Sequence, residues 1–164
     1  NAKVIVHEFA DFLCPHCKFA LPTLKAFVSS KPDVQLRFYA FPLSAECNAA
    51  IGGSGPDRCR LARVSYCAEK EFSKGKEVTT ELFAQQGYYR SSNVISEIAA
   101  KFSLDEQKLS QCEADKASNE AILAQAKLGQ DAGIRGTPAI FINGKKLSYG
   151  ARLPILNGVY EIAK

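Results

Sequence analysis

Two cysteines, Cys14 and Cys17, lie two residues apart where a strand-like pattern gives way to a helical one. Residues 4–12 predict a buried strand and a turn, and apolar residues recur at helical spacing over 21–28. Pro15 suits the first turn of a helix, because its missing N–H would have no partner there. Cys14 is therefore predicted to lie at a helix N-terminus.

That position predicts redox chemistry. Free amide groups and the helix dipole stabilise a thiolate, so the pKa of Cys14 should be lowered. A thiolate attacks disulfides, and a thiol of low pKa also leaves readily. Cys17, one helical turn later, can close a disulfide with Cys14. Protonated His16 would add positive charge, stabilise the reduced form and make the disulfide a stronger oxidant.

A zinc site and a purely structural disulfide are less favoured roles for the cysteine pair. Zinc needs four ligands, but no second Cys-x-x-Cys occurs and the only histidines are His7 and His16. We therefore predict no metal site. The order strand, Cys-x-x-Cys, helix favours a redox role over a structural disulfide.

Length and composition indicate a globular chain with a substantial core. The 164 residues carry a net charge of +4, dispersed along the chain, which does not favour nucleic-acid binding. No apolar run approaches the roughly 20 residues of a membrane span. Methionine is absent, so we expect a mature or trimmed product whose removed N-terminal segment could have been a signal peptide or a membrane tether. The six cysteines favour an oxidising compartment.

The remaining pattern predicts an α/β fold interrupted by helices. A strand over 34–41 completes a βαβ unit with a right-handed crossover. Only helical pattern follows over 57–133, where five helices are expected. A strand over 139–142 then leads through Asn143-Gly144, a strong hairpin signal, to a return strand over 146–149 and a final helix.

Local residues predict where three of the inserted helices begin. Asp57 and Asp105 are expected to cap two of them, and Ser118 or Asn119 a third. Thr137-Pro138 comes just before a strand that reads as buried. Because proline cannot donate to a ladder, we expect a cis bond there.

With these motifs in place, the chain resembles the DsbA-like thiol-disulfide oxidoreductases of the thioredoxin superfamily. The stretch from Val6 to Cys17 is similar to the family's first strand and its Cys-Pro-His-Cys site. Residues 135–145 resemble its cis-proline loop and hairpin. The other four cysteines are similar to those of bacterial members that work with a vitamin K epoxide reductase-like membrane domain. The resemblance implies a thioredoxin-like domain over 1–45 and 134–164, with an inserted helical subdomain over 57–133.

The resemblance also implies a role for each site residue. Cys14, flanked by Pro15 and His16, would be the exposed nucleophile, and Cys17 the buried resolving thiol. Pro138 would lie against the disulfide, while Gly136 and the backbone of Thr137 would bind an extended substrate peptide as an added strand. Glu8 matches the family's buried acid, which could relay a proton to or from Cys17. An ordinary charged residue at a strand edge is the alternative for Glu8.

Four cysteines remain, and they allow three pairings. Cys59 and Cys67 lie on one predicted helix about 12 Å apart, beyond disulfide reach. We favour Cys47–Cys59 with Cys67–Cys112, both structural. The pairing Cys47–Cys67 with Cys59–Cys112 stays open, as do buried free thiols.

We therefore expect a monomeric extracytoplasmic oxidase, periplasmic in bacteria, that donates the Cys14–Cys17 disulfide to folding proteins and needs no metal or organic cofactor. A quinone-linked membrane partner, DsbB-like or vitamin K epoxide reductase-like, would reoxidise it. Most such oxidases carry valine before the cis proline, whereas Thr137 is more similar to disulfide isomerases. A disulfide isomerase or reductase is therefore the alternative, and a metal carrier using Cys14, Cys17 and His16 is a third.

Overall fold

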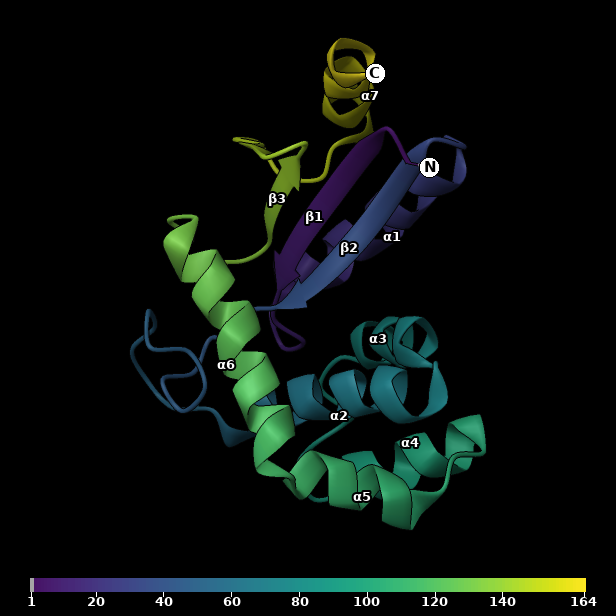
Figure 1. The fold of residues 1–164 in the computed structure, drawn as a ribbon, viewed down its shortest axis with the longest axis vertical. Helices are drawn as coiled ribbons and strands as arrows, with labels where there is room; N and C mark the ends of the chain where they lie inside the picture. Colours follow the sequence, from purple (N-terminus) through teal and green to yellow (C-terminus); the bar gives the residue numbers. More distant parts are fainter. Residues whose placement is uncertain (1) are drawn as a thin grey trace.

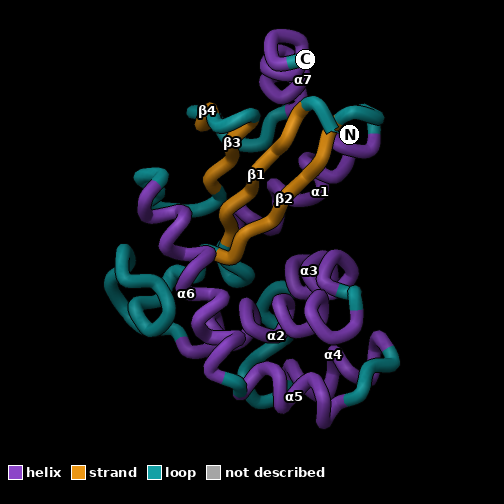
Figure 2. The backbone as a smooth tube through the Cα atoms, in the orientation of Figure 1, coloured by secondary structure: helices purple, strands orange, loops and turns teal. Residues whose placement is uncertain are grey.

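A four-stranded mixed sheet, ordered β2-β1-β3-β4, forms the frame of the molecule (Figure 2). Strand β1 (Val4–Ala10) runs parallel to β2 (Val34–Ala40) and antiparallel to β3 (Ala139–Ile142). Strand β4 (Lys145–Lys146) extends the edge beside β3. The computed structural model describes residues 2–164. The end of β1 at the centre of the sheet leads directly into the turn before Cys14.

Seven helices accompany the sheet within residues 2–164, and five of them form an insertion between β2 and β3 (Figure 1). The fold is thus an α/β fold with an inserted set of helices, as the sequence predicts. The helices are α1 (Pro15–Ser29), α2 (Pro56–Phe72), α3 (Gly75–Ala84), α4 (Val94–Phe102), α5 (Glu106–Ala114), α6 (Lys116–Asp131) and α7 (Leu153–Ala163).

Side chains of β1 point alternately to the two faces of the sheet. Each face therefore carries side chains on which helices pack. On one face, Val4 and Val6 pack in one cluster with Leu24 of α1 and Leu156 of α7. On the other face, which α6 covers (Figure 1), Phe9 packs in one cluster with Phe41 and with Ala126 of α6. The two faces thus have separate apolar clusters, and α1 and α7 share one of them.

Helix α6 approaches the sheet closely at a glycine. A Cβ atom at Gly129 would lie 2.5 Å from the ring of Phe41, a fully buried side chain, and 3.2 Å from that of Phe9. Only a residue without a side chain fits this contact, since the aromatic rings are themselves packed. Gly129 therefore sets the distance between α6 and the strands that lead to the active site.

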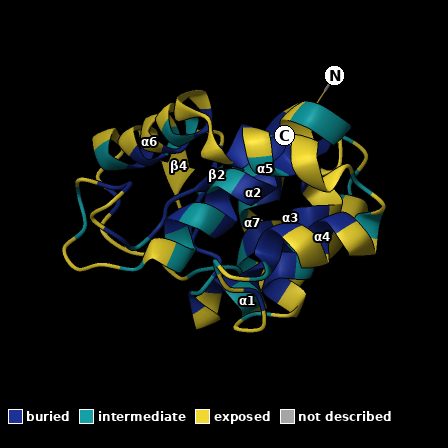
Figure 3. Ribbon diagram, turned by 90° about the horizontal axis from the view of Figure 1, so that it is seen from below, coloured by how far each residue is buried: buried dark blue, intermediate teal, exposed yellow. Residues whose placement is uncertain are grey.

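The inserted helices share one apolar core with the segment that carries the cysteine pair. Phe12, Cys14 and Cys17 belong to the same buried cluster as Leu61 of α2 and Leu82 of α3. The α2 helix lies at the centre of the insertion and is largely buried (Figure 3). The insertion is therefore packed against the site and continuous with it.

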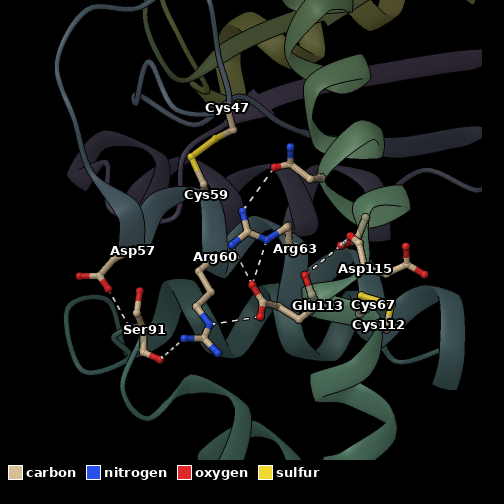
Figure 4. Close-up of polar contacts among 12 residues, drawn as sticks. Cys47, Asp57, Cys59, Arg60, Arg63, Cys67, Ser91, Cys112, Glu113 and Asp115 are labelled. Carbon is tan, nitrogen blue, oxygen red and sulfur yellow. Dashed lines mark hydrogen bonds and ion pairs between the residues drawn. A yellow bond between two sulfur atoms is a disulfide. The ribbon is translucent and has the colours of Figure 1, made fainter.

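Two disulfides and a buried ion-pair cluster hold the insertion together (Figure 4). The disulfides are Cys47–Cys59, with a Cα–Cα distance of 6.0 Å, and Cys67–Cys112, with a Cα–Cα distance of 5.9 Å. These are the two pairs that the sequence favours. Glu113 on α5 accepts ion pairs from Arg63 at 2.8 Å and Arg60 at 3.4 Å, both on α2. These contacts fix α2 and α5 to each other.

Some local predictions about helix ends and the hairpin are wrong. Gly55 precedes α2, and Asp57 lies within its first turn and accepts a hydrogen bond from the Ser91 N–H instead of capping the helix. Asp115, not Ser118 or Asn119, caps α6 by accepting from the Ala117 N–H. The return strand is limited to β4, short of the expected range 146–149. Asp105 does cap α5, through the Lys108 N–H.

We predict that Gly129→Ala lowers the free energy of unfolding by about 1–3 kcal/mol, because the added methyl group overlaps the Phe41 ring. Gly158→Ala in α7 is the matched control, since a Cβ there meets no atom within 4 Å. That change should stabilise the protein by about 0.5–1 kcal/mol through helix propensity. Urea denaturation followed by circular dichroism measures both, and equal stability of the two variants would contradict the close contact.

Candidate active site

The first turn of α1 begins at Cys14. Cys14 has extended backbone angles (φ −80°, ψ 118°) and Pro15 occupies the first helical position, as the sequence predicts. The Cys14 N–H donates to the carbonyl oxygen of Asp11 at 3.1 Å. The Cys14 carbonyl in turn accepts from the N–H groups of Cys17, at 3.1 Å, and Lys18, at 3.3 Å. The amide groups of this turn thus lie around the cysteine pair.

The second motif meets the first in space. The Thr137–Pro138 peptide bond is cis, the isomer that the sequence favours, and it lies in the segment between α6 and β3. The Cys14 Sγ lies 3.5 Å from the carbonyl oxygen of Thr137, although the two residues are 123 positions apart. Residues that the chain places far apart therefore form one site.

The pKa of Cys14 is lowered to about 5. The largest cause is a hydrogen bond from the Cys17 thiol, and the Thr137 side chain and the backbone N–H groups of Cys17 and His16 add to it. Burial acts in the opposite direction, because it disfavours a charged sulfur. Hydrogen bonds to the anion outweigh that cost, so Cys14 is a thiolate at neutral pH.

The pKa of Cys17 is raised, first by the hydrogen bond that its thiol gives to Cys14 and second by burial. Cys17 therefore stays protonated when Cys14 is ionised. This asymmetry distinguishes the two sulfurs: one is an anion and the other its hydrogen-bond donor. The roles of Cys14 as the attacked sulfur and Cys17 as the resolving thiol remain predictions.

The expectation of an openly exposed nucleophile is wrong. Cys14 has 6% of its surface exposed, and Cys17 has none. The reason is the contact with Thr137, since the cis-proline segment lies against Cys14. Pro15 and His16 are exposed beside it, as is Gly136, and Pro138 is half-buried. A substrate sulfur must therefore approach Cys14 beside these more exposed residues.

Thr137 contributes its side chain as well as its carbonyl group. Its hydroxyl oxygen is buried and has no hydrogen-bond partner among residues 2–164. The same side chain acts to lower the pKa of both Cys14 and Cys17. The Thr137 side chain thus influences both sulfurs although its hydroxyl group makes no hydrogen bond to either.

Glu8 is a second titratable group in the core of the sheet. It is fully buried, and neither carboxylate oxygen has a hydrogen-bond partner among the described residues. Burial raises its pKa to about 8. Along β1, Glu8 lies two residues from Val6 and from Ala10 and shares their face of the sheet, so it faces the side covered by α1, which carries Cys17. The carboxyl group can hold a proton at neutral pH, which a relay to Cys17 would require.

Three further residues contact the site that the sequence did not single out. Asp11, Arg58 and Gln86 make hydrogen bonds to the turn before Cys14 or within it. Asp11 could have been suspected as a turn residue, because aspartate often bonds to the backbone two positions ahead. Arg58 and Gln86 come from the insertion, and no local pattern marks them.

Within residues 2–164, no group of three or more histidine, cysteine, aspartate or glutamate side chains is placed to hold a metal ion. In the same range no helix is both long and apolar enough to cross a bilayer.

We predict that alkylation of Cys14 by iodoacetamide in the reduced protein follows a titration with a midpoint near pH 5. Cys17 should remain unmodified across this range because its thiol stays protonated. Mass spectrometry of tryptic peptides, sampled over time at each pH, measures both rates. In urea the midpoint should return to about 8.5, the value of free cysteine. That value in the folded protein would rule out a stabilised Cys14 thiolate.

We predict that Glu8→Gln becomes increasingly more stable than the wild type as the pH rises from 5 to 8. In this window the folded wild type keeps a proton on Glu8 that the unfolded chain has lost, so its stability falls with pH by up to about 1.4 kcal/mol per unit. The contribution of Cys14 is common to both proteins and cancels in the difference. Urea titrations of the reduced proteins measure the gap.

The control is Glu120→Gln, at an exposed carboxylate paired with Lys116 on α6. Its stability relative to the wild type should not change over the same pH range. A gap for Glu8→Gln that is constant with pH would contradict the raised pKa.

Comparison with known proteins gives a consistent result. Residues 5–161 match the family model of the DSBA-like thioredoxin domain. A curated relative, "Probable disulfide bond formation protein D" of Bacillus anthracis, is 25% identical over 150 residues, which cover 88% of this chain and 67% of that protein.

Solved structures share the fold. BdbD of Bacillus subtilis has a TM-score of 0.82 at 20% identity, covering 99% of this chain and 88% of that one. A thioredoxin-like oxidoreductase of Silicibacter pomeroyi has a TM-score of 0.80 at 23% identity, with 99% and 87% covered. DsbA2 of Pseudomonas aeruginosa has a TM-score of 0.77 at 23% identity, with 99% and 90% covered. Because the family model matches nearly the whole length of this chain, the chain belongs to the DsbA-like thioredoxin domain family of thiol-disulfide oxidoreductases.

Proposed function

We propose that this protein is an extracytoplasmic thiol oxidase that donates the Cys14–Cys17 disulfide to reduced proteins as they fold. The observation that carries the proposal is the asymmetry of the two thiols, since the pKa of Cys14 is lowered to about 5 while that of Cys17 is raised. A stabilised thiolate favours the reduced enzyme, and this makes the disulfide a strong oxidant.

The reaction transfers two electrons from the substrate to the enzyme. A substrate thiolate attacks the Cys14 sulfur, the Cys14–Cys17 bond breaks, and Cys17 leaves as a thiolate that takes up a proton. The second substrate thiolate then attacks the substrate sulfur of the mixed disulfide. A disulfide forms in the substrate, and Cys14 leaves as a thiolate. The substrate is oxidised, and the enzyme ends in the dithiol form.

Glu8 is proposed to supply the proton that Cys17 takes up. Its carboxyl group is buried on the face of the sheet that α1 covers, and with its pKa at about 8 it carries a proton at neutral pH. The unsatisfied oxygens of Glu8 support this role, because a carboxyl group used only for structure would be expected to have partners.

Gly136, Thr137 and Pro138 are proposed to bind the substrate. An extended peptide can pair with this backbone as an added strand, which recognises main-chain groups and tolerates many sequences. The 3.5 Å contact between the Thr137 carbonyl and the Cys14 sulfur supports this, because a peptide held there would lie beside the reacting atom.

Reoxidation needs an electron acceptor outside this chain, and a quinone-linked membrane protein, DsbB-like or vitamin K epoxide reductase-like, is the proposed partner. In the proposal the protein is a monomer, periplasmic or otherwise extracytoplasmic. The two disulfides of the insertion support an oxidising compartment. Residues 1–45 and 134–164 would form the thioredoxin-like domain, with 57–133 as the inserted subdomain.

A disulfide isomerase or reductase is the second candidate, and Thr137 favours it. The buried hydroxyl group acts on both sulfurs and would affect how readily a mixed disulfide is released. The equilibrium of the Cys14–Cys17 pair with glutathione distinguishes the candidates. A strongly oxidising pair supports the oxidase, and a strongly reducing pair supports the alternative.

We predict that Cys14→Ser abolishes oxidation of a reduced model substrate, whereas Cys17→Ser, mixed with the oxidised form of that substrate, accumulates mixed disulfides through Cys14. The reason is that the Cys14 thiolate attacks the substrate disulfide, one substrate sulfur leaves as a thiolate, and no Cys17 thiol remains to displace the other from Cys14. Non-reducing electrophoresis and mass spectrometry of the adduct measure trapping. Cys14→Ser in the same assay is the control, and adducts formed equally by both variants would contradict the assignment of roles.

A further inference from the structure

Gln86 from the insertion donates two hydrogen bonds to the turn that contains the nucleophile. It follows α3, and its side-chain amide lies 2.9 Å from the carbonyl oxygen of Phe12 and 2.9 Å from that of Cys14. The phenyl rings of Phe12 and Phe83 pack against each other with centroids 4.8 Å apart. One neutral donor thus holds two carbonyl groups of the turn at once.

Arg58 holds the same turn through a buried carboxylate. Asp11 is 1% exposed, and its Oδ1 accepts from the Leu13 N–H at 2.7 Å and from Arg58 at 2.5 Å. Its Oδ2 accepts from the Leu43 N–H at 2.6 Å. Three donors satisfy the carboxylate, and Arg58 is the only one of these that carries a charge. A buried carboxylate without such a partner would be costly.

The turn from Asp11 to Cys14 in turn determines where the sulfurs lie. The Asp11 carbonyl accepts the Cys14 N–H at 3.1 Å, and the Asp11 backbone acts to lower the pKa of the Cys17 thiol. A shift of this turn would move the start of α1, whose amide groups and Cys17 thiol stabilise the Cys14 anion. Charge-assisted hydrogen bonds weaken quickly when distance or angle changes.

We propose that Arg58 and Gln86 are positioning residues that lock the turn from Asp11 to Cys14 and so hold the start of α1 in the geometry that stabilises the Cys14 thiolate. Both act through the backbone and Asp11. The helical insertion thereby tunes the reactivity of a nucleophile that belongs to the other part of the fold.

The anchoring of α2 supports this role for Arg58. The next residue, Cys59, is joined to Cys47, and Arg60 then contacts Glu113 and the Ser91 carbonyl oxygen (Figure 4). Arg58 therefore lies at a helix start that is held by a disulfide, an ion pair and a hydrogen bond. Because its backbone is held in this way, its hydrogen bond can fix the position of the Asp11 side chain.

The test measures thiol chemistry in Arg58→Met and Gln86→Met, which remove the donors and keep most of the side-chain volume. We expect the midpoint of pH-dependent Cys14 alkylation to rise by about one unit in each variant. The equilibrium with glutathione should shift about tenfold toward the oxidised protein, since the reduced form loses that stabilisation. Arg58→Lys keeps the charge and should recover part of both shifts.

Arg90→Met is the matched control, because Arg90 is a half-exposed arginine of the insertion that pairs with Asp57 at 3.9 Å. It should leave both measurements at the wild-type values. Urea denaturation of each variant separates stability from positioning. A variant that loses stability while its alkylation midpoint and glutathione equilibrium stay unchanged has a structural role only, and that result in both methionine variants overturns the proposal.

The inference rests on the proposed role of Cys14, and the experiment separates the two. If the wild type itself alkylates like free cysteine, the proposed function fails. If the wild type shows the lowered midpoint and Arg58→Met and Gln86→Met share it, the function stands and the positioning role fails.

Discussion

The whole site depends on keeping a negative charge on a sulfur atom that has almost no access to water. Burial alone would raise the pKa of Cys14, as it does for Cys17 and Glu8. The protein reverses the sign by replacing water with fixed donors, namely the Cys17 thiol, the Thr137 side chain and two backbone amides. Each unit of pKa corresponds to about 1.4 kcal/mol, so the placement of a few donors decides how strongly the Cys14 thiolate is stabilised.

This requirement explains the arrangement of the fold around the site. Strand β1 delivers the turn, α1 supplies the amides, and the cis-proline segment closes over the sulfur from the far end of the chain. The insertion completes the enclosure because Phe12 and both cysteines share a core with its helices. Gly129 lets α6 lie directly on the strands from the other face.

Much of this could be predicted from the sequence, for reasons that are local. Cys14 and Pro15 indicate a helix start from neighbouring residues alone. Asp105 caps α5 by accepting a hydrogen bond from the N–H of the residue three positions ahead. The predictions failed where two local candidates competed, as for Asp115 against Ser118. They were also silent where contacts depend on tertiary distance. Nothing in the sequence near Gln86 shows that its amide reaches residues more than seventy positions away.

The preference for the dithiol form inside the core that the cysteine pair shares with the inserted helices has a thermodynamic consequence. Because the pair can be oxidised or reduced in both the folded and the unfolded chain, the redox couple and global unfolding form a single thermodynamic cycle. The free energy by which folding favours the dithiol form equals the difference in free energy of unfolding between the reduced and the oxidised protein. The stronger the oxidant that the Cys14–Cys17 disulfide forms, the lower is the free energy of unfolding of the oxidised protein relative to the reduced protein. Transfer of the disulfide to a substrate therefore leaves the folded enzyme more stable.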